Sequence, residues 1–235
     1  MTSKAISELS VFFPAYNEEE NLESTVKKAQ KVLQKIAKKW EIIIINDGSK
    51  DNTAQVADKL AKHKNVSVIH HSPNRGYGGA FKSGLYGSRY NWIAFTDSDG
   101  QFDFSEIVNF IKKRDESNAD VVVGYYKKRQ VKKSIILTSK MWEWLVYFLF
   151  GLHVRDIDCG FKLISKEVVD SIPRLQSERG AFISSEFLIK AKKQGFKIVE
   201  IPVTHYPRVG GAPTGRNLDV IVQSFLDLFK LRLKI

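Results

Sequence analysis

The sequence predicts an α/β fold with one open, mostly parallel β-sheet that carries helices on both faces. Segments with strand and helix patterns alternate from the N-terminus, which is typical of such a sheet. Residues 41–46 are almost all isoleucine, and an apolar run of this kind indicates a strand that is buried on both faces. The length of 235 residues suits one domain of this class.

The first half of the chain predicts four strands, each followed by a helix. The first helix is expected to begin at Asn17, an N-cap residue with Glu20 as its capping-box partner, and its apolar positions recur at helical spacing as far as Ala37. The expected strands cover residues 9–13, 41–46, 66–70 and 93–96, and the later helices cover residues 56–61, 80–90 and 106–114.

The second half continues the alternation. We expect strands over residues 120–123, 161–164 and 196–205, and helices over residues 134–150 and 182–194. The first of these helices is rich in aromatic residues, which we interpret as core, with an apolar ligand channel as the alternative. Residues 1–216 form the expected domain. An amphipathic helix over residues 217–235 follows, and docking on the protein's own core and contact with a membrane interface are equally open for it.

The composition of the chain limits the binding partners and the cellular compartment that we expect for it. The net charge of +11 attracts anions such as nucleotide phosphates, nucleic acid or anionic lipid headgroups, and five basic residues cluster within residues 127–133. No recognised nucleic-acid-binding motif accompanies them, so nucleic acid is not an expected partner. One cysteine, Cys159, fits a reducing compartment. The N-terminus lacks the apolar core of a signal peptide, and the longest apolar stretch is too short to cross a bilayer, so we expect a cytoplasmic protein.

Two aspartates, Asp97 and Asp99, follow the fourth predicted strand directly. In an extended backbone residues i and i+2 face the same way, so both carboxylates can point at one ion. Carboxylate oxygens are the ligands that Mg²⁺ and Mn²⁺ prefer, and phosphate oxygens usually complete the coordination shell. A polar turn that ends at Gly100 is the alternative reading of this short motif.

The other strand exits favour the first reading. Ligands of an open α/β sheet gather at the carboxyl ends of the strands, so the segments that leave each strand should share one site. The exits are residues 14–18, 46–49, 74–79 and 97–99, and they are rich in Asn, Asp, Glu and Gly. Glycines in the third exit allow close approach of the backbone to phosphate, and the following helix N-terminus adds a favourable field.

In this order and spacing the four exits resemble the inverting glycosyltransferases of family 2, which have the Rossmann-like GT-A fold. Residues 156–162, 200–203 and 205–214 are similar to the polyprenyl-phosphate branch of that family, so the resemblance covers nearly the whole chain. It implies transfer of a hexose from GDP-mannose or UDP-glucose to a polyprenyl phosphate, dolichyl or undecaprenyl, with inversion. A related enzyme that glycosylates a hydroxyl of a polysaccharide or protein is the alternative. The presence of both Asp97 and Asp99 argues against a catalytically dead subunit.

The resemblance implies roles for individual residues. Asp47 would accept a hydrogen bond from an imino N–H of the base, which uracil and guanine both carry, and Glu18 would contact the ribose. Asp97, Asp99 and Gln101 would hold Mg²⁺ or Mn²⁺. The whole nucleotide-sugar site would comprise Pro14, Ala15, Tyr16, Asn17, Glu18, Asp47, Gly48, Asn74, Arg75, Gly76, Asp97 and Ser98.

The acceptor side of the expected site is cationic. A lipid monophosphate is already ionised near neutral pH and needs no general base, so cationic groups that hold two anions close are needed instead. Candidates are Arg129, Lys132, Lys133 and Arg208. The chain departs from the branch after Gly124, where Tyr125 and Tyr126 stand in place of a small residue and an arginine, so the phosphate-binding role shifts to Lys127 or Arg129.

For several other polar residues we expect structural roles. Asp156 and Glu186 are expected to cap a helix or to pair with a cation, with a direct catalytic role as the alternative. His70, His71 and His153 lack metal-ligand spacing and are expected to pack or to face water, whereas His205 lies in a segment that resembles the branch. The resemblance implies a peripheral position at the inner face of the membrane. The anchor would be the C-terminal helix, a separate membrane subunit or a longer chain.

Overall fold

The computed structural model describes residues 5–127, 133–178, 180, 182–208 and 218–234, without the side chains of residues 133–137 and 218–222. One seven-stranded sheet has the order β3-β2-β1-β4-β6-β5-β7. Its strands are β1 (Ile6–Ala15), β2 (Ala37–Asn46), β3 (Val66–His70), β4 (Trp92–Thr96), β5 (Val121–Tyr126), β6 (Phe161–Ser165) and β7 (Ile198–Val203). The helices are α1 (Leu22–Ile36), α2 (Thr53–Ala61), α3 (Gly76–Gly87), η1 (Phe104–Glu106), α4 (Ile107–Ser117), α5 (Lys133–Phe150), α6 (Lys166–Ser171), α7 (Phe182–Lys193) and α8 (Leu218–Lys234).

The sheet is mostly parallel, as predicted. β1 to β4 run in the same direction, and β7 runs parallel to β5. β6 is the exception, because it lies antiparallel between β4 and β5. The start of β6 therefore lies at the same edge of the sheet as the end of β4, and it brings the segment before Phe161 to that edge. The sequence predicted this strand but not its direction.

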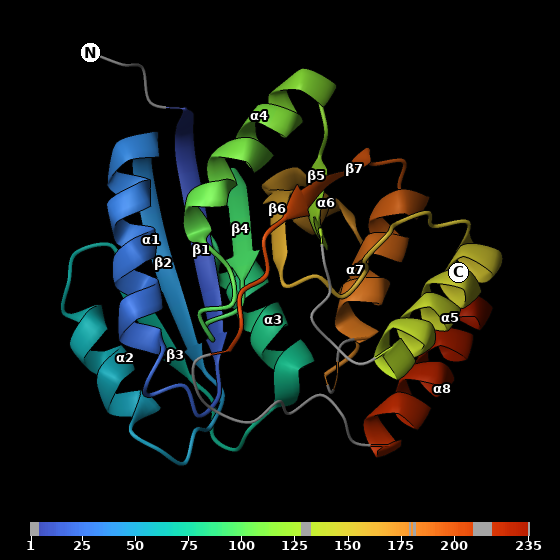
Figure 1. Cartoon of the computed structure of the whole chain (residues 1–235), viewed down its shortest axis with the longest axis horizontal. Coiled ribbons are helices and arrows are strands. Elements are labelled where there is room, and N and C mark those ends of the chain that lie inside the picture. The colour runs from blue at the N-terminus through green and yellow to red at the C-terminus, as the bar shows by residue number, and fades with distance from the viewer. Residues whose placement is uncertain (1–4, 128–132, 179, 181, 209–217, 235) are drawn as a thin grey trace.

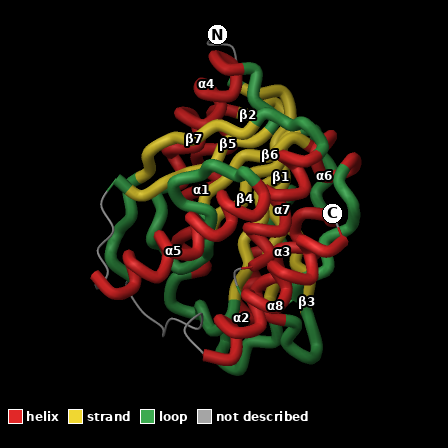
Figure 2. The backbone as a smooth tube through the Cα atoms, turned by 90° about the vertical axis from the view of Figure 1, so that its right-hand side faces the viewer, coloured by secondary structure: helices red, strands yellow, loops and turns green. Residues whose placement is uncertain are grey.

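Helices cover both faces of the sheet, which confirms the predicted layers (Figure 1). On one face α1, α2 and α4 pack over a core that includes Val11, Phe13 and Ile44. On the other, α3, α6 and α7 pack with α5 and α8 over Phe12 and Ile45. Figure 2 is viewed from the side on which α5, α7 and α8 lie. Successive residues at the centres of β1 and β2 enter opposite cores, which explains why residues 11–13 and 42–45 are all apolar.

The predicted start of the first helix is wrong. α1 begins at Leu22 with Asn21 as the N-cap, and Asn21 makes no side-chain capping bond. Asn17 has a φ of +55°, and its side chain accepts a hydrogen bond from the Lys50 amide at 2.8 Å. Asn17 therefore joins two strand exits instead of capping a helix.

Other boundaries also differ. α1 ends at Ile36 and β2 starts at Ala37, because Ala37 already has extended dihedral angles and pairs with Ile6. β5 runs on to Tyr126, since β7 continues the pairing as far as Val203. α3 begins earlier than expected, β7 is shorter than expected, and α6 was not predicted.

The C-terminal segment is helical, as expected. In α8, Leu228 and Leu231 are buried against the second core, which supports docking on the protein's own core. Leu226, Phe229 and Leu233 are exposed on the same helix. In the parts of the chain that the structure describes, no helix combines the length and apolar character that a bilayer crossing requires.

Candidate active site

The exits of β1, β2 and β4 are tied to one another by hydrogen bonds, as the predicted topology requires. The Asp47 amide donates to the Ala15 carbonyl at 2.9 Å. The Ser98 hydroxyl donates to the Pro14 carbonyl at 2.6 Å, and the Glu18 amide donates to the Thr53 hydroxyl at 2.8 Å. These bonds hold the polar residues after each strand in fixed positions at one edge of the sheet.

Glycine is required where two of these exits meet. Gly48 has a φ of +68°, and a Cβ at this position would lie 2.9 Å from the backbone nitrogen of Asn74. A side chain would therefore force apart the exits of β2 and β3. Gly48 positions this part of the site through its missing side chain.

Three carboxylates gather where β1 and β4 end: Glu18, Asp97 and Asp99. Glu18 and Asp99 are buried, and Asp97 is partly buried. Burial, together with the negative charge of Asp99, raises the pKa of Asp97 to about 7. Burial also raises the pKa of Glu18, and Asp99 adds to that effect. The ionised forms of Glu18 and Asp97 are therefore destabilised in this site, because little solvent and a neighbouring negative charge surround them.

Arg208 lies against this cluster. Its guanidinium donates to a Glu18 carboxylate oxygen and, at 3.4 Å, to Asp99 Oδ2. Arg208 lies in the segment that leaves β7, and Figure 1 shows this segment crossing toward the lower ends of β1 and β4. The resemblance assigned Arg208 to the acceptor phosphate, but in the structure it contacts the carboxylates expected to hold the donor.

Asp97 is enclosed by the segment that precedes β6. Its amide donates to the Gly160 carbonyl at 3.2 Å, and a Cβ at Gly160 would lie 1.9 Å from Asp97 Oδ2. The Tyr77 hydroxyl donates to the other carboxylate oxygen at 3.4 Å. The fully buried Lys162, whose pKa is lowered by burial, also acts on Asp97 and opposes the rise of its pKa.

Of the predicted metal ligands, Gln101 is joined to Asp99 through its backbone, and its side chain is directed to Tyr206. The Gln101 amide donates to Asp99 Oδ1 at 3.0 Å, and its side-chain amide donates to the Tyr206 carbonyl at 3.0 Å. Among the described residues no group of three or more His, Cys, Asp or Glu side chains forms a metal cluster. A divalent cation would therefore need oxygen ligands from elsewhere, as Mg²⁺ does when it binds a diphosphate. The carboxylate oxygens of Asp97 and Asp99 are hard donors that fit such an ion, and the ion would take over from Arg208 part of the charge neutralisation at Asp99.

Asp47 has a partner that the sequence analysis missed. His71 Nδ1 lies 2.6 Å from Asp47 Oδ1, and His71 is buried rather than facing water. The Arg75 amide donates to the same oxygen at 2.9 Å. The one available signal was strand alternation, which places His71 opposite His70.

Arg75 and Asn74 take part mainly through their local geometry. The Asn74 side chain donates to the Asp47 carbonyl at 2.5 Å and accepts from the Gly76 amide at 2.9 Å. The Arg75 guanidinium donates to Glu178 at 3.3 Å, so its charge is directed at the loop before α7. In this structure Arg75 reaches Asp47 only through its backbone amide.

The expected acceptor residues are less well defined. Arg129 and Lys132 lie outside the described residues, and Lys133 begins α5 with its side chain also outside them. Tyr126 is stacked on Phe102 and lies edge-on to His205, with ring centroids 6.0 and 4.6 Å apart. Tyr126 thus packs beside the segment that carries Arg208, whereas the Tyr125 ring lies under the Arg155 guanidinium.

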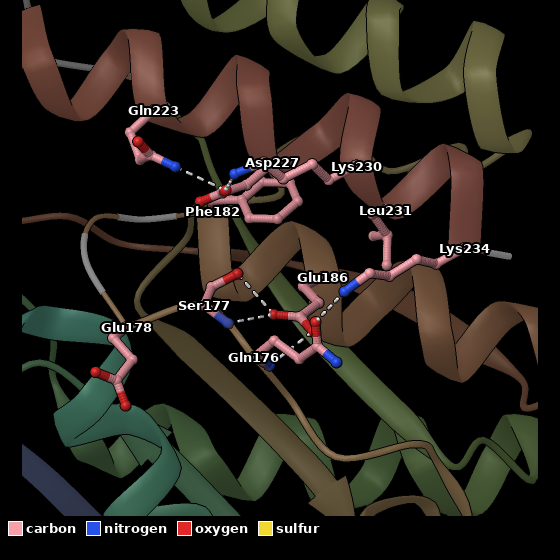
Figure 3. A pocket seen from close by; sticks show the side chains of 10 residues that line it. All are labelled: Gln176, Ser177, Glu178, Phe182, Glu186, Gln223, Asp227, Lys230, Leu231 and Lys234. Carbon is pink, nitrogen blue, oxygen red and sulfur yellow. Dashed lines mark hydrogen bonds and ion pairs between the residues drawn. The ribbon is translucent and has the colours of Figure 1, made fainter.

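Glu186 has the structural role that was favoured for it. Lys190 donates to Glu186 at 2.6 Å, and the Ser177 hydroxyl donates at 2.7 Å. Burial alone would raise the pKa of Glu186, but these hydrogen bonds lower it below the ordinary value. Glu186 lines a cavity of about 590 Å³ between α7, α8 and the preceding loop (Figure 3). Asp156 is buried beside the start of β6.

Comparisons with known proteins agree on one family. A family model described as glycosyl transferase family 2 matches residues 10–172. The chain is 32% identical over 238 residues to a dolichyl-phosphate beta-glucosyltransferase of Saccharomyces cerevisiae, covering 91% of this chain and 71% of that protein. It is 33% identical over 216 residues to the Homo sapiens protein of the same name, covering 83% and 66%. The glycosyltransferase AglD of Haloferax volcanii is 28% identical over 210 residues, covering 86% and 33%.

Solved structures resemble the fold. Glucosyl-3-phosphoglycerate synthase from Mycobacterium tuberculosis, in complex with Mn²⁺, UDP and phosphoglyceric acid, superposes with a TM-score of 0.71. The match covers 97% of this chain and 78% of that chain at 19% identity. The same synthase in complex with Mn²⁺ and UDP-glucose gives a TM-score of 0.70 at 19% identity and covers 97% and 80%. The observed layers and strand order are thus those of a known fold.

The raised pKa of Asp97 predicts a pH-dependent cost in stability. The pKa of this carboxyl is about 7 in the folded protein and 3.8 as its ordinary value, so the folded state holds more protons between these limits and stability falls as pH rises through them. Asp97→Asn should raise the melting temperature in metal-free buffer, and the gain should grow by several degrees from about pH 5 to about pH 8. Calorimetry checks this. Asp170→Asn, at an exposed aspartate on α6, is the control, and a gain that does not vary with pH would contradict the prediction.

Proposed function

The chain belongs to glycosyl transferase family 2, and we propose that it transfers a hexose from a nucleotide diphosphate sugar to a polyprenyl phosphate, with inversion at the anomeric carbon. The names of the yeast and human relatives support a dolichyl-phosphate acceptor and a glucosyl donor. Uracil and guanine both present an imino N–H to Asp47, so UDP-glucose and GDP-mannose are both candidate donors.

One observation carries the proposal: Glu18, Asp47, Asp97 and Asp99 come from three separate strand exits and meet at one edge of the sheet. A nucleotide sugar offers complementary groups, which are an imino N–H, ribose hydroxyls and a diphosphate with its metal ion. In the proposed arrangement Asp47 receives the base, Glu18 the ribose, and Asp97 and Asp99 the metal-bound diphosphate. Mg²⁺ or Mn²⁺, when bound, neutralises the charge that develops on the leaving nucleoside diphosphate.

The chain's own residues provide the rest of the chemistry. Asp97 is fixed by Tyr77 and by the Gly160 peptide, so it is oriented before any ligand arrives. Arg208 holds Glu18 and Asp99 and presents a positive charge to bound phosphate. An ionised lipid phosphate attacks without a base, which agrees with the engagement of Glu186 by Lys190 and Ser177. The hydroxyl-acceptor alternative would need a base that is free to accept a proton.

A lipid acceptor requires contact with a membrane, and α5 and α8 are suited to this. On α5, Met141, Trp144 and Phe148 are 63%, 66% and 72% exposed. On α8, Leu226, Phe229 and Leu233 are exposed as well, and the two helices touch where Trp142 meets Phe225. Residues 223–234 carry three basic residues and one acidic residue, which favours anionic headgroups. These two faces together form the proposed peripheral contact.

The transfer reaction is the first test. With UDP-glucose or GDP-mannose as donor and undecaprenyl phosphate as acceptor, the protein should form a labelled lipid only when Mg²⁺ or Mn²⁺ is present. Asp99→Ala should lower the rate by at least about a hundredfold, because it removes a ligand of the ion that stabilises the leaving group. Extraction of labelled lipid measures the rate.

Two controls accompany this assay. Asp170→Asn should leave transfer unchanged, because Asp170 lies on α6 and pairs only with Lys166 in the described structure. Undecaprenol, which lacks the phosphate, should accept no sugar. Equal transfer to undecaprenol would favour the hydroxyl-acceptor alternative, and full activity of Asp99→Ala would contradict the proposed site.

Membrane contact is tested separately with vesicles. Replacing Trp144 and Phe148 together by serine should weaken binding to phosphatidylglycerol vesicles by about tenfold or more, since each large apolar side chain contributes on the order of 1.5–3 kcal/mol when buried. Co-sedimentation measures the bound fraction. Val108→Ser is the matched control, because Val108 is an exposed apolar residue on α4. Unchanged binding of the double variant would refute the role of α5.

A further inference from the structure

The exposure and contacts of His71 give it a role that its place in the sequence does not suggest. His71 follows β3, and its side chain is only 5% exposed, as is that of Asp47. Nδ1 lies 2.6 Å from Asp47 Oδ1, and Nε2 lies 2.8 Å from the Ser83 hydroxyl on α3. The ring is thus held at both nitrogens. The His71 amide donates to the Asn46 carbonyl at 2.9 Å, which also fixes its backbone against the exit of β2.

The hydrogen bonds define which atom carries the proton. Asp47 Oδ1 already accepts from the Arg75 amide at 2.9 Å, and a carboxylate has no proton to give, so His71 Nδ1 is the donor. In the neutral ring Nε2 then accepts from Ser83. The order Ser83 to His71 to Asp47 is therefore a directed chain of hydrogen bonds that ends on a carboxylate.

These hydrogen bonds leave one oxygen of the Asp47 carboxylate for a ligand. Both bonds to the carboxylate go to Oδ1, and none of the described residues donates to Oδ2. Among the described residues, Thr96 Oγ1 is the one fully buried side-chain oxygen or nitrogen that lacks a hydrogen-bond partner. Asp47 Oδ2 also lacks a partner among these residues but is not fully buried, so it keeps some contact with solvent. An oxygen that is oriented and unpaired in this way suits a single N–H donor.

We propose that His71 is a positioning residue that, together with Ser83, orients the Asp47 carboxylate so that Oδ2 selects nucleobases with an imino N–H. The inference rests on the proposed function, because it takes Asp47 to receive the base of the donor. It adds the selection device: uracil and guanine carry a proton at the recognised ring nitrogen, whereas cytosine and adenine carry a lone pair there. A lone pair facing Oδ2 is repelled, so discrimination depends on how firmly the carboxylate is held.

The readout is the ratio of the affinities for two nucleotides that differ at the recognised ring nitrogen. A purely structural role of His71 would leave this ratio unchanged. Binding of UDP and CDP, and of GDP and ADP, is measured by calorimetry with Mn²⁺ for the wild type and each variant. His71→Leu removes both hydrogen bonds. It should weaken the preferred nucleotide by about 10- to 100-fold, the range expected for a lost hydrogen bond to a charged group, and reduce the preference for UDP over CDP or GDP over ADP by a similar factor.

Further variants separate positioning from folding. His71→Asn keeps an N–H near Asp47 and should retain most of the affinity and the base preference. Ser83→Ala removes only the far partner and should cost about 2- to 10-fold. His153→Asn, at an exposed histidine after α5, is the matched control and should bind as the wild type does. If His71→Leu does not fold, the comparison of His71→Asn and Ser83→Ala with the wild type carries the test.

The outcomes distinguish this inference from the proposed function. If the wild type binds neither UDP nor GDP, the proposed function fails. If the wild type binds and Asp47→Asn loses affinity while the variants of His71 and Ser83 behave as the wild type, the inference about His71 is overturned alone. A loss of affinity in His71→Leu that is equal for UDP and CDP, or for GDP and ADP, would also overturn it.

Discussion

Mutual repulsion among Glu18, Asp97 and Asp99 is the constraint on which the rest of the site depends. Three carboxylates at one sheet edge, two of them with raised pKa values, are held together only because the fold fixes their backbones. Arg208 and the buried Lys162 offset part of the charge. An arrangement that is costly without a cation is well prepared for a ligand that brings one, and a metal-bound diphosphate is such a ligand.

The fold supplies the compensating groups from its second half. Because β6 runs antiparallel between β4 and β5, Gly160 and Lys162 lie beside Asp97. The segment that leaves β7 then returns to β1 and β4 and carries Arg208 to the cluster. The donor-side acids therefore come from the first half of the chain, and the groups that make their proximity tolerable come from the second half.

Sequence patterns predicted what depends on local chemistry. The isoleucine run of β2, the alternation of elements and the polar exits after β1 to β4 led directly to the layers and to a shared edge where Glu18, Asp97 and Asp99 gather. Features that depend on distant contacts were not predictable. Asn17 is a residue type that commonly caps helices, but its side chain accepts a hydrogen bond from the Lys50 amide instead. His71 has a role only through its contacts with Asp47 and Ser83, which are distant in the sequence. The roles of Arg129 and Lys133 remain predictions from the resemblance.

In the proposed arrangement the carboxylate cluster and Asp47 together hold one metal-bound nucleotide. A crystal structure of the protein with Mn²⁺ and UDP or GDP tests it most directly, because anomalous scattering locates the metal independently of the nucleotide. We expect Mn²⁺ in contact with Asp97 or Asp99 and the base against Asp47 Oδ2. A nucleotide bound elsewhere, or a metal ion remote from both aspartates, would contradict it.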